Sequence, residues 1–279
     1  MNILYCGDAS MAPGVLLSVM SLVAHTAEKL QVFLLTAQLK TADRSYAPLA
    51  AADAAFIDRW LQAARPGSRV MRLDITTQFL REPPTANMAT RFTPYCMLRL
   101  YADQISALPD RLLYLDTDVI AAADPSDFYH QDLASAEVVG VLDHYGKWAF
   151  HTRLGFDYLN SGVLLMDLAA LRESGLLAAC RRRCAKVKMF MPDQSALNKL
   201  AGPKKRVAKR RYNDQHGPHA DTVLLHFSTR LKFLPKFTPI SVKPWEVAKV
   251  HDQLNYHAQD ALLADFETTL AQMKGQTHD

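Results

Sequence analysis

Cysteine is scarce in this chain, and its distribution gives no support for a disulfide framework or a zinc site. Only four cysteines occur among 279 residues, at Cys6, Cys96, Cys180 and Cys184. The last two are four residues apart and are predicted to lie on one face of a helix, but a structural zinc site needs two more ligands nearby, and the sequence shows none. We therefore expect four reduced thiols, as in a cytosolic protein.

Long hydrophobic runs are also missing. The longest apolar stretch near the start, residues 14–24, is too short and too interrupted to span a bilayer. No basic region precedes the first apolar residues, and Asp8 follows them at once, so no targeting segment is predicted. We expect a cytoplasmic protein, with peripheral contact to the inner face of the membrane as an open alternative.

The chain has no large surplus of charge. Its 32 Lys and Arg against 28 Asp and Glu leave a formal charge of +4, which gives no strong case for a nucleic-acid partner. One local exception is the basic segment 204–211, in which six of eight residues are Lys or Arg. This segment could bind an anionic lipid or a phosphorylated glycan, or it could be ordinary solvated surface charge.

What the chain does have is an alternation of apolar strand-like runs with helical patterns over its first half. This order predicts an α/β domain built from parallel strands with right-handed crossovers. The predicted strands are residues 3–6, 32–35, 70–75 and 112–116, and the predicted helices are 13–25, 43–64 and 94–107.

The second half is less regular but continues the same class of structure. Strands are predicted at 138–142, 163–166 and 222–226, and a helix at 168–187. After Phe237 the pattern turns polar and helical. We therefore predict a catalytic domain over residues 1–235 and a C-terminal helical tail over 236–279.

The strongest chemical signal is a pair of acidic residues at the end of a buried strand. In residues 113–120, an apolar run carries Asp116 and Asp118 two positions apart, so both would face the same side of a strand unless the chain turns there. Two close carboxylates repel, and a hard cation such as Mg²⁺ or Mn²⁺ relieves that conflict. The plainer alternative is two solvated residues on an edge strand. Asp8 ends the first strand, so it could reach the same crevice.

Four segments in order carry a resemblance to a known family. Together with 113–120, residues 160–168, 193–198 and 225–227 resemble glycosyltransferase family 8, which contains glycogenin and the bacterial transferases that extend lipopolysaccharide. The resemblance spans residues 1 to about 230. It implies a GT-A fold, with a mixed and mostly parallel sheet flanked by helices. It also implies retaining, metal-dependent transfer of a hexose, glucose or galactose, from a UDP-sugar to a glycan or glycolipid acceptor.

The resemblance also implies roles for individual residues. Asp116, Asp118 and His226 would bind Mn²⁺ or Mg²⁺. Asp143, Asp193 and Gln194 would surround the transferred sugar and carry catalysis. The residues expected to bind the donor are Cys6, Asp8, Ser10, Arg99, Thr117, Asn160 and Lys232.

Some of these residues have plainer interpretations. A lone histidine such as His226 is often structural, and Asp8 or Asp193 could simply cap a helix. Ser10 stands where the family often has Asn. The family's Lys-Pro-Trp motif is matched by Lys243 and the two residues after it, but Lys232 lies at the expected distance from His226. We expect Lys232 to bind the diphosphate and Trp245 to anchor the tail.

Two rival functions use parts of the same pattern. A haloacid-dehalogenase phosphatase also has Asp-x-Asp after an apolar strand, but near its amino terminus and followed by a Gly-Asp-x-x-x-Asp motif that this chain lacks after its pair. A non-catalytic protein that binds sugar nucleotides is the other rival. The presence of Asp116, Asp118, Gln194 and His226 argues against it, because loss of function usually removes such ligands first.

Overall fold

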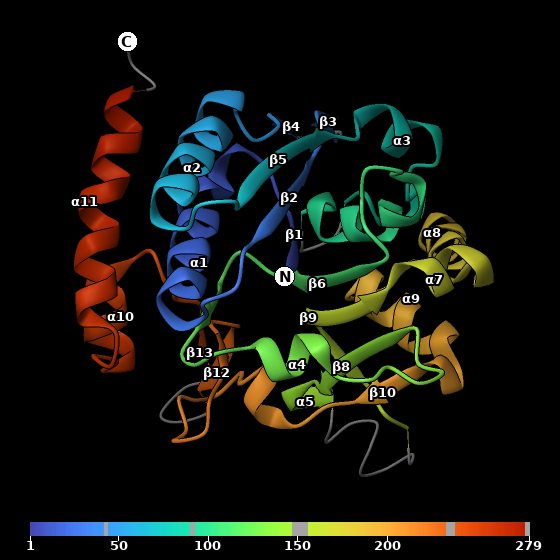
Figure 1. The fold of residues 1–279 in the computed structure, drawn as a ribbon. Coiled ribbons are helices and arrows are strands. Elements are labelled where there is room, and N and C mark those ends of the chain that lie inside the picture. The colour runs from blue at the N-terminus through green and yellow to red at the C-terminus, as the bar shows by residue number, and fades with distance from the viewer. Residues whose placement is uncertain (42–43, 90–92, 147–155, 233–237, 277–279) are drawn as a thin grey trace.

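A seven-stranded sheet forms the centre of the molecule (Figure 1). The computed structural model describes residues 1–279 apart from 42–43, 90–92, 147–155, 233–237 and 277–279. One strand, β9, is antiparallel to both of its neighbours, and the other neighbouring pairs are parallel, so the expected mixed, mostly parallel sheet is confirmed. In spatial order the strands are β10 (Lys205–Val207), β8 (Val138–Leu142), β9 (Leu159–Asp167), β6 (Arg111–Leu115), β1 (Asn2–Cys6), β2 (Gln31–Thr36) and β5 (Arg69–Asp74).

Helices cover both faces of this sheet because its strands are apolar on both sides. In β1, Ile3 and Tyr5 join one buried cluster, whereas Leu4 and Cys6 join the other, as alternation along a strand requires. The first cluster packs under α1 (Ala12–His25), α2 (Ala51–Ala64) and α11 (Asp260–Gln276). The second packs under the 3-10 helix η3 (Pro94–Gln104), α3 (Thr76–Arg81), α7 (Leu168–Ser174), α8 (Leu176–Lys186) and α9 (Pro192–Ala201).

Smaller elements complete the structure around the main sheet. Three pairs of short strands are β7 (Val119–Ala121) with β11 (Leu224–His226), β12 (Arg230–Lys232) with β13 (Thr238–Ile240), and β3 (Leu39–Lys40) with β4 (Ser45–Tyr46). The short helices include α4 (Ser126–His130), α5 (His144–Gly146) and η1 (Ala9–Met11). Across the described ranges, no helix combines the length and apolar character that crossing a membrane requires.

The C-terminal tail packs on the body of the protein. It contains α10 (Val247–Leu254) and α11, and α11 runs alongside α1 (Figure 1). Val250, Leu263, Phe266 and Met273 are buried and belong to the same cluster as the apolar face of α1. The predicted domain boundary at residue 235 falls outside the described residues and stays a prediction.

Two predicted helices were wrong in their extent. The helix expected from residue 43 begins only at Ala51, because Pro48 lacks an amide hydrogen and disfavours helical geometry before it, and the chain bridges to Asp8 there instead. The helix expected over 168–187 is divided at Gly175, whose φ of 66° is left-handed and ends α7.

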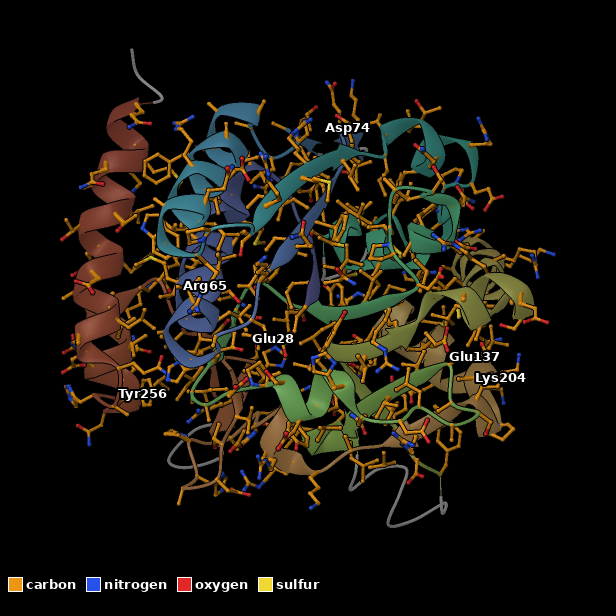
Figure 2. The ribbon with its side chains drawn as sticks, viewed as in Figure 1. Glu28, Arg65, Asp74, Glu137, Lys204 and Tyr256 are labelled. Atoms are coloured by element: carbon orange, nitrogen blue, oxygen red, sulfur yellow. The ribbon has the colours of Figure 1, made fainter. Side chains whose placement is uncertain are left out.

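The basic segment 204–211 is largely paired within the chain. Lys204 forms an ion pair of 2.8 Å with Glu137, and both side chains lie at the same edge of the molecule (Figure 2). Arg206 donates to Gln131, and Arg210 pairs with the buried Asp214. These contacts favour the alternative in which the segment supplies structural and surface charge.

Candidate functional site

The two acidic residues lie in a turn, not in the strand that precedes them. Strand β6 ends at Leu115, and Val119 N donates to Asp116 O at 3.1 Å to close the turn before β7. The chain therefore turns here, which is the alternative that the sequence left open, and strand alternation does not align the carboxylates. Asp116 stays fixed to the sheet because its amide donates to Gly162 O on β9 at 2.7 Å.

Pairing of β7 with β11 brings His226 to these carboxylates. His226 is opposite Val119 in the register, and Phe227 N donates to Asp118 O at 3.0 Å. His226 Nε2 consequently lies 3.3 Å from Asp118 Oδ1 and 3.9 Å from Asp116 Oδ2. The ligand atoms of Asp116, Asp118 and His226 all lie within 4.8 Å of one another, as a single metal ion would need.

The surroundings of the imidazole fit metal binding. His226 Nδ1 lies 3.0 Å from Asn213 Oδ1, an oxygen that can only accept, so Nδ1 carries the hydrogen and Nε2 is left to face the carboxylates. Gly162 provides the clearance, because a Cβ there would lie 2.3 Å from His226 Cε1 and 2.9 Å from Asp116 Oδ2. Two carboxylates and one imidazole suit Mn²⁺ or Mg²⁺.

Lys243, from the C-terminal part of the chain, forms an ion pair with Asp118. Its Nζ lies 2.5 Å from Asp118 Oδ2. Burial alone would raise the pKa of Asp118, but the positive charges of Lys243 and His226 hold that pKa well below its usual value. Burial would likewise lower the pKa of His226, but Asp118 and Asp116 raise it. Asp118 is therefore a buried carboxylate whose ionised form is stabilised by the positive charges beside it. The side chain of Lys232 lies outside the part of the chain whose side chains are described.

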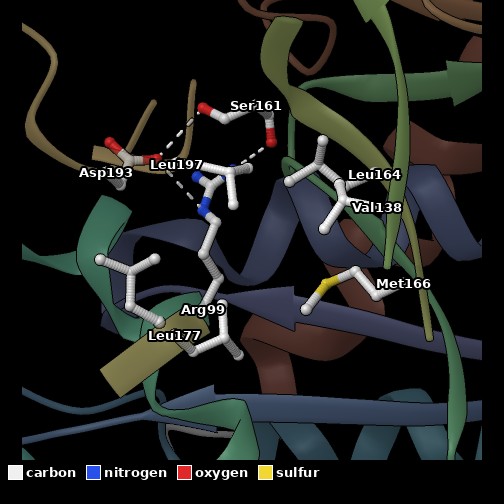
Figure 3. A pocket seen from close by; sticks show the side chains of 9 residues that line it. Arg99, Val138, Ser161, Leu164, Met166, Leu177, Asp193 and Leu197 are labelled. Carbon is white, nitrogen blue, oxygen red and sulfur yellow. Dashed lines mark hydrogen bonds and ion pairs between the residues drawn. The ribbon is translucent and has the colours of Figure 1, made fainter. Parts of the chain in front are cut away.

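Arg99 connects the acidic pair to the start of α9, and Figure 3 shows its guanidinium beside Asp193 and Ser161. This buried guanidinium donates from Nη2 to Asp116 Oδ1 at 2.9 Å, and its Nε lies 3.4 Å from Asp193 Oδ2. Arg99 Nη1 also donates to Ser161 O on β9. The guanidinium carbon Cζ lies 4.0 Å from the centroid of the Tyr114 ring. Leu98 and Leu100, which flank Arg99 in η3, are apolar and buried. Direct contact between Arg99 and a donor stays a prediction.

Gln194 and Asp143 meet in a second, fully buried group beside this pair. Gln194 Nε2 donates to Asp143 Oδ2 at 3.2 Å, and Asn160 Nδ2 donates to the same oxygen at 3.0 Å. Gln194 Oε1 accepts from Ser161 N at 3.0 Å and from Ser161 Oγ at 3.3 Å. Asp193 Oδ2 accepts from Ser161 Oγ at 3.1 Å. The catalytic residues expected from the sequence thus form one hydrogen-bonded network.

The residues expected to read the nucleotide gather at the end of β1. Asp8 caps η1 by accepting from Ser10 N at 3.0 Å and from Ser10 Oγ at 2.5 Å, so the capping alternative describes its contacts in this structure. Thr117, in the turn between the two aspartates, donates to Met11 Sδ at 3.2 Å. Cys6 is buried in β1 two residues before Asp8. The turn that carries the acidic pair therefore touches the segment that carries Asp8.

Sequence reasoning missed several residues of the site. Ser161 lies within residues 160–168, one of the four segments that resemble the family, so the sequence could have indicated it. Asn213 has no sequence signal, because only folding brings it to His226. His144 and His216 stack at 3.4 Å next to Asp143, and burial lowers the pKa of His216 to about 4.

Comparison with known proteins identifies the family and supports the fold. A model of Glycosyl transferase family 8 matches residues 2–247. An active-site mutant of LgtC superposes with a TM-score of 0.70 at 18% identity, over 96% of each chain. The galactosyltransferase LgtC in complex with donor and acceptor sugar analogs gives 0.66 at 19% identity, over 95% of this chain and 96% of that one. GlyE of Streptococcus pneumoniae gives 0.63 at 18% identity, over 99% of this chain and 64% of that one. No curated protein matches.

The family match and the fold identify a glycosyltransferase with the GT-A fold. This chain belongs to glycosyltransferase family 8, as the sequence resemblance indicated. The phosphatase alternative is not supported, since the family match covers most of the chain.

Asn213 gives a test of the site that does not touch a ligand directly. Asn213→Ala should weaken Mn²⁺ binding by roughly 10- to 100-fold, because the imidazole loses the partner that fixes its orientation. Asn213→Asp keeps an acceptor for Nδ1 and should restore much of the affinity. Water-proton relaxation measures Mn²⁺ binding without turnover. Equal affinity in the wild type and in Asn213→Ala would show that the imidazole does not bind the ion.

Proposed function

We propose that the protein is a retaining, metal-dependent enzyme that moves a hexose from a UDP-sugar to a glycan or glycolipid acceptor. The single observation that supports this most is the convergence of Asp116, Asp118 and His226 next to the buried Gln194 and Asp143 network. In this proposal the first group would bind the leaving diphosphate and the second would contact the transferred sugar. The related LgtC structure with donor and acceptor sugar analogs supports a nucleotide-sugar donor and a glycan acceptor.

The metal would be Mn²⁺ or Mg²⁺, held by the two carboxylates and His226 Nε2. When bound, it supplies positive charge for the leaving diphosphate. The chain's own contribution is to fix the three ligands: Arg99 and Tyr114 OH hold Asp116 Oδ1, at 2.9 and 2.5 Å, and Asn213 orients the imidazole. An imidazole in the set favours Mn²⁺ over Ca²⁺.

The remaining residues would bind the nucleotide and the transferred sugar. Cys6, Asp8, Ser10 and Thr117 would read the nucleotide at the end of β1. Asn160 and Asp193 would contact the transferred sugar together with Asp143. A cytoplasmic location, as the sequence suggests, belongs to this proposal.

For the diphosphate lysine we propose Lys243. Its ammonium already lies in the acidic centre, 2.5 Å from Asp118, and it opens the Lys-Pro-Trp motif. A metal ion bound by Asp118 would compete for that carboxylate, and a phosphate oxygen offers Lys243 an equivalent partner. Trp245 would help to hold Lys243 in place, because its ring packs against Gly14 in α1. A Cβ added at Gly14 would lie 2.5 Å from Trp245 Cζ3.

Gln194 suits front-face attack better than double displacement. An amide oxygen is a weak nucleophile, and Gln194 Oε1 already accepts two hydrogen bonds from Ser161. We propose that the acceptor hydroxyl attacks on the face from which the diphosphate departs, and that a diphosphate oxygen takes its proton. Gln194 and Asp143 would stabilise the positive charge that develops at the anomeric carbon.

The lysine assignment can be tested with a matched pair of variants. Lys243→Ala should weaken UDP binding in the presence of Mn²⁺ by roughly tenfold or more, because a hydrogen bond to a charged group contributes about 1.5–3 kcal/mol. Lys232→Ala is the control and should change the affinity less. Calorimetric titration with UDP measures both. A larger loss in Lys232→Ala would return the role to Lys232.

The stereochemistry tests the proposed reaction. The enzyme should give an α-linked product from an α-linked UDP-hexose, and the anomeric proton coupling in NMR reports this directly. Gln194→Ala should lose most but not all of the rate, because the amide stabilises charge without forming a bond. A β-linked product would overturn the retaining reaction, and a sugar adduct on wild-type Gln194, detected by mass spectrometry, would overturn front-face attack.

A further inference from the structure

The C-terminal tail carries a second cluster of metal-ligating side chains, formed by His251, His257 and Asp260. Their ligand atoms all lie within 4.8 Å of one another. The cluster lies beyond residues 2–247, the part matched by the family, and none of its three residues has a role in the proposed reaction. We propose that these three residues form a Zn²⁺ site that fastens α10 to α11.

The geometry of the three side chains is close to that of a zinc site. His251 Nε2 lies 2.9 Å from Asp260 Oδ1, and His257 Nδ1 lies 3.2 Å from Asp260 Oδ2. Ligand atoms around tetrahedral zinc lie about 3.3 Å apart, given bonds of about 2.0–2.1 Å. The two imidazole rings stack at 4.6 Å with an angle of 22°, so both present an edge nitrogen to the same carboxylate.

The backbone that carries the ligands is held by buried neighbours. Tyr256 is buried and packs against Phe227 at 6.0 Å, at the lower end of the tail helices (Figure 2). Gln259 Nε2 donates to Ala121 O on β7 at 2.7 Å. Tyr256 and Gln259 thus flank His257 in the sequence. His251 lies in the last turn of α10, and Asp260 is the first residue of α11. Ligands on a fixed frame lose little entropy when they bind a metal.

The donor set selects the kind of metal. Two imidazole nitrogens and one carboxylate suit Zn²⁺, whereas Mg²⁺ and Ca²⁺ prefer oxygen ligands. Three protein ligands leave a fourth position for water, which is accessible because His257 and Asp260 are exposed. The site therefore differs in preference from the Asp116, Asp118 and His226 centre, which offers two carboxylates.

Zinc here would act on the tail as a whole. The ligands span only ten residues, but they join the end of α10 to the start of α11, which packs along α1. Helix α10 begins directly after Glu246, whose carboxylate accepts from Lys243 N at 3.0 Å. A bound ion would thus brace the tail next to the segment that carries Lys243.

Calorimetric titration with Zn²⁺ tests the site. The titration uses the full chain carrying Asp118→Asn, because that change removes a ligand from the other centre. This protein should bind one Zn²⁺ per chain. Adding His257→Ala or Asp260→Asn should weaken binding at least tenfold, since the loss of a direct ligand costs no less than the loss of an outer partner. His130→Ala is the matched control, because His130 has a 58% exposed side chain paired with Glu28, and His257 is 55% exposed.

Cobalt binding provides a second measurement that does not depend on calorimetry. Co²⁺ added to the same Asp118→Asn protein should give the visible absorption of a site with nitrogen ligands, and Zn²⁺ should displace it. Loss of the band in His257→Ala and its retention in His130→Ala would support the site. Unchanged Zn²⁺ affinity in both tail variants, or no binding to the parent protein, would overturn it and leave Asp260 as a carboxylate paired with two imidazoles.

Discussion

The short antiparallel pairing of β7 with β11 is the constraint on which the site depends. His226 and Asp118 are more than a hundred positions apart in the chain, yet the register places His226 opposite Val119, the residue after Asp118. The hydrogen bond from Phe227 N to Asp118 O fixes the same alignment from the next residue. A slip of one residue would turn the imidazole to the other face, because alternate side chains in a strand point in opposite directions.

Charge balance explains why the residues around this pairing are the ones found there. Asp116 and Asp118 lie within a few ångströms of each other, and Asp118 is buried. Like charges in such a place are costly unless cations surround them. Arg99 compensates Asp116 and Lys243 compensates Asp118, each through an ion pair. The Arg99 guanidinium is buried, whereas the side chain of Lys243 is 35% exposed.

The sequence predicted the parts of this arrangement that depend on local pattern. Apolar runs of four to six residues identified six of the seven strands of the main sheet, whereas β10 was missed because it lies in the basic segment. Asp8 and Asp116 were expected to reach one crevice, and they follow β1 and β6, which pair in parallel. The sequence left open whether strand alternation or a turn positions Asp118, and the structure has the turn, after Leu115. The break at Gly175 was missed because helical spacing continues on both sides of it. Contacts such as Asn213 with His226 depend on the folded chain, so no spacing in the sequence could reveal them.

The central claim is that Asp116, Asp118 and His226 bind the ion that makes UDP-sugar turnover possible. The most direct measurement is UDP release from UDP-glucose and UDP-galactose by the wild type and by Asp118→Ala, with Mn²⁺ and with a chelator. The account predicts Mn²⁺-dependent release by the wild type and a fall of at least about a hundredfold in the variant, since metal stabilisation of a leaving group amounts to several kcal/mol. The variant should keep the circular dichroism of the wild type. Full turnover in chelator, or in Asp118→Ala, would contradict the account.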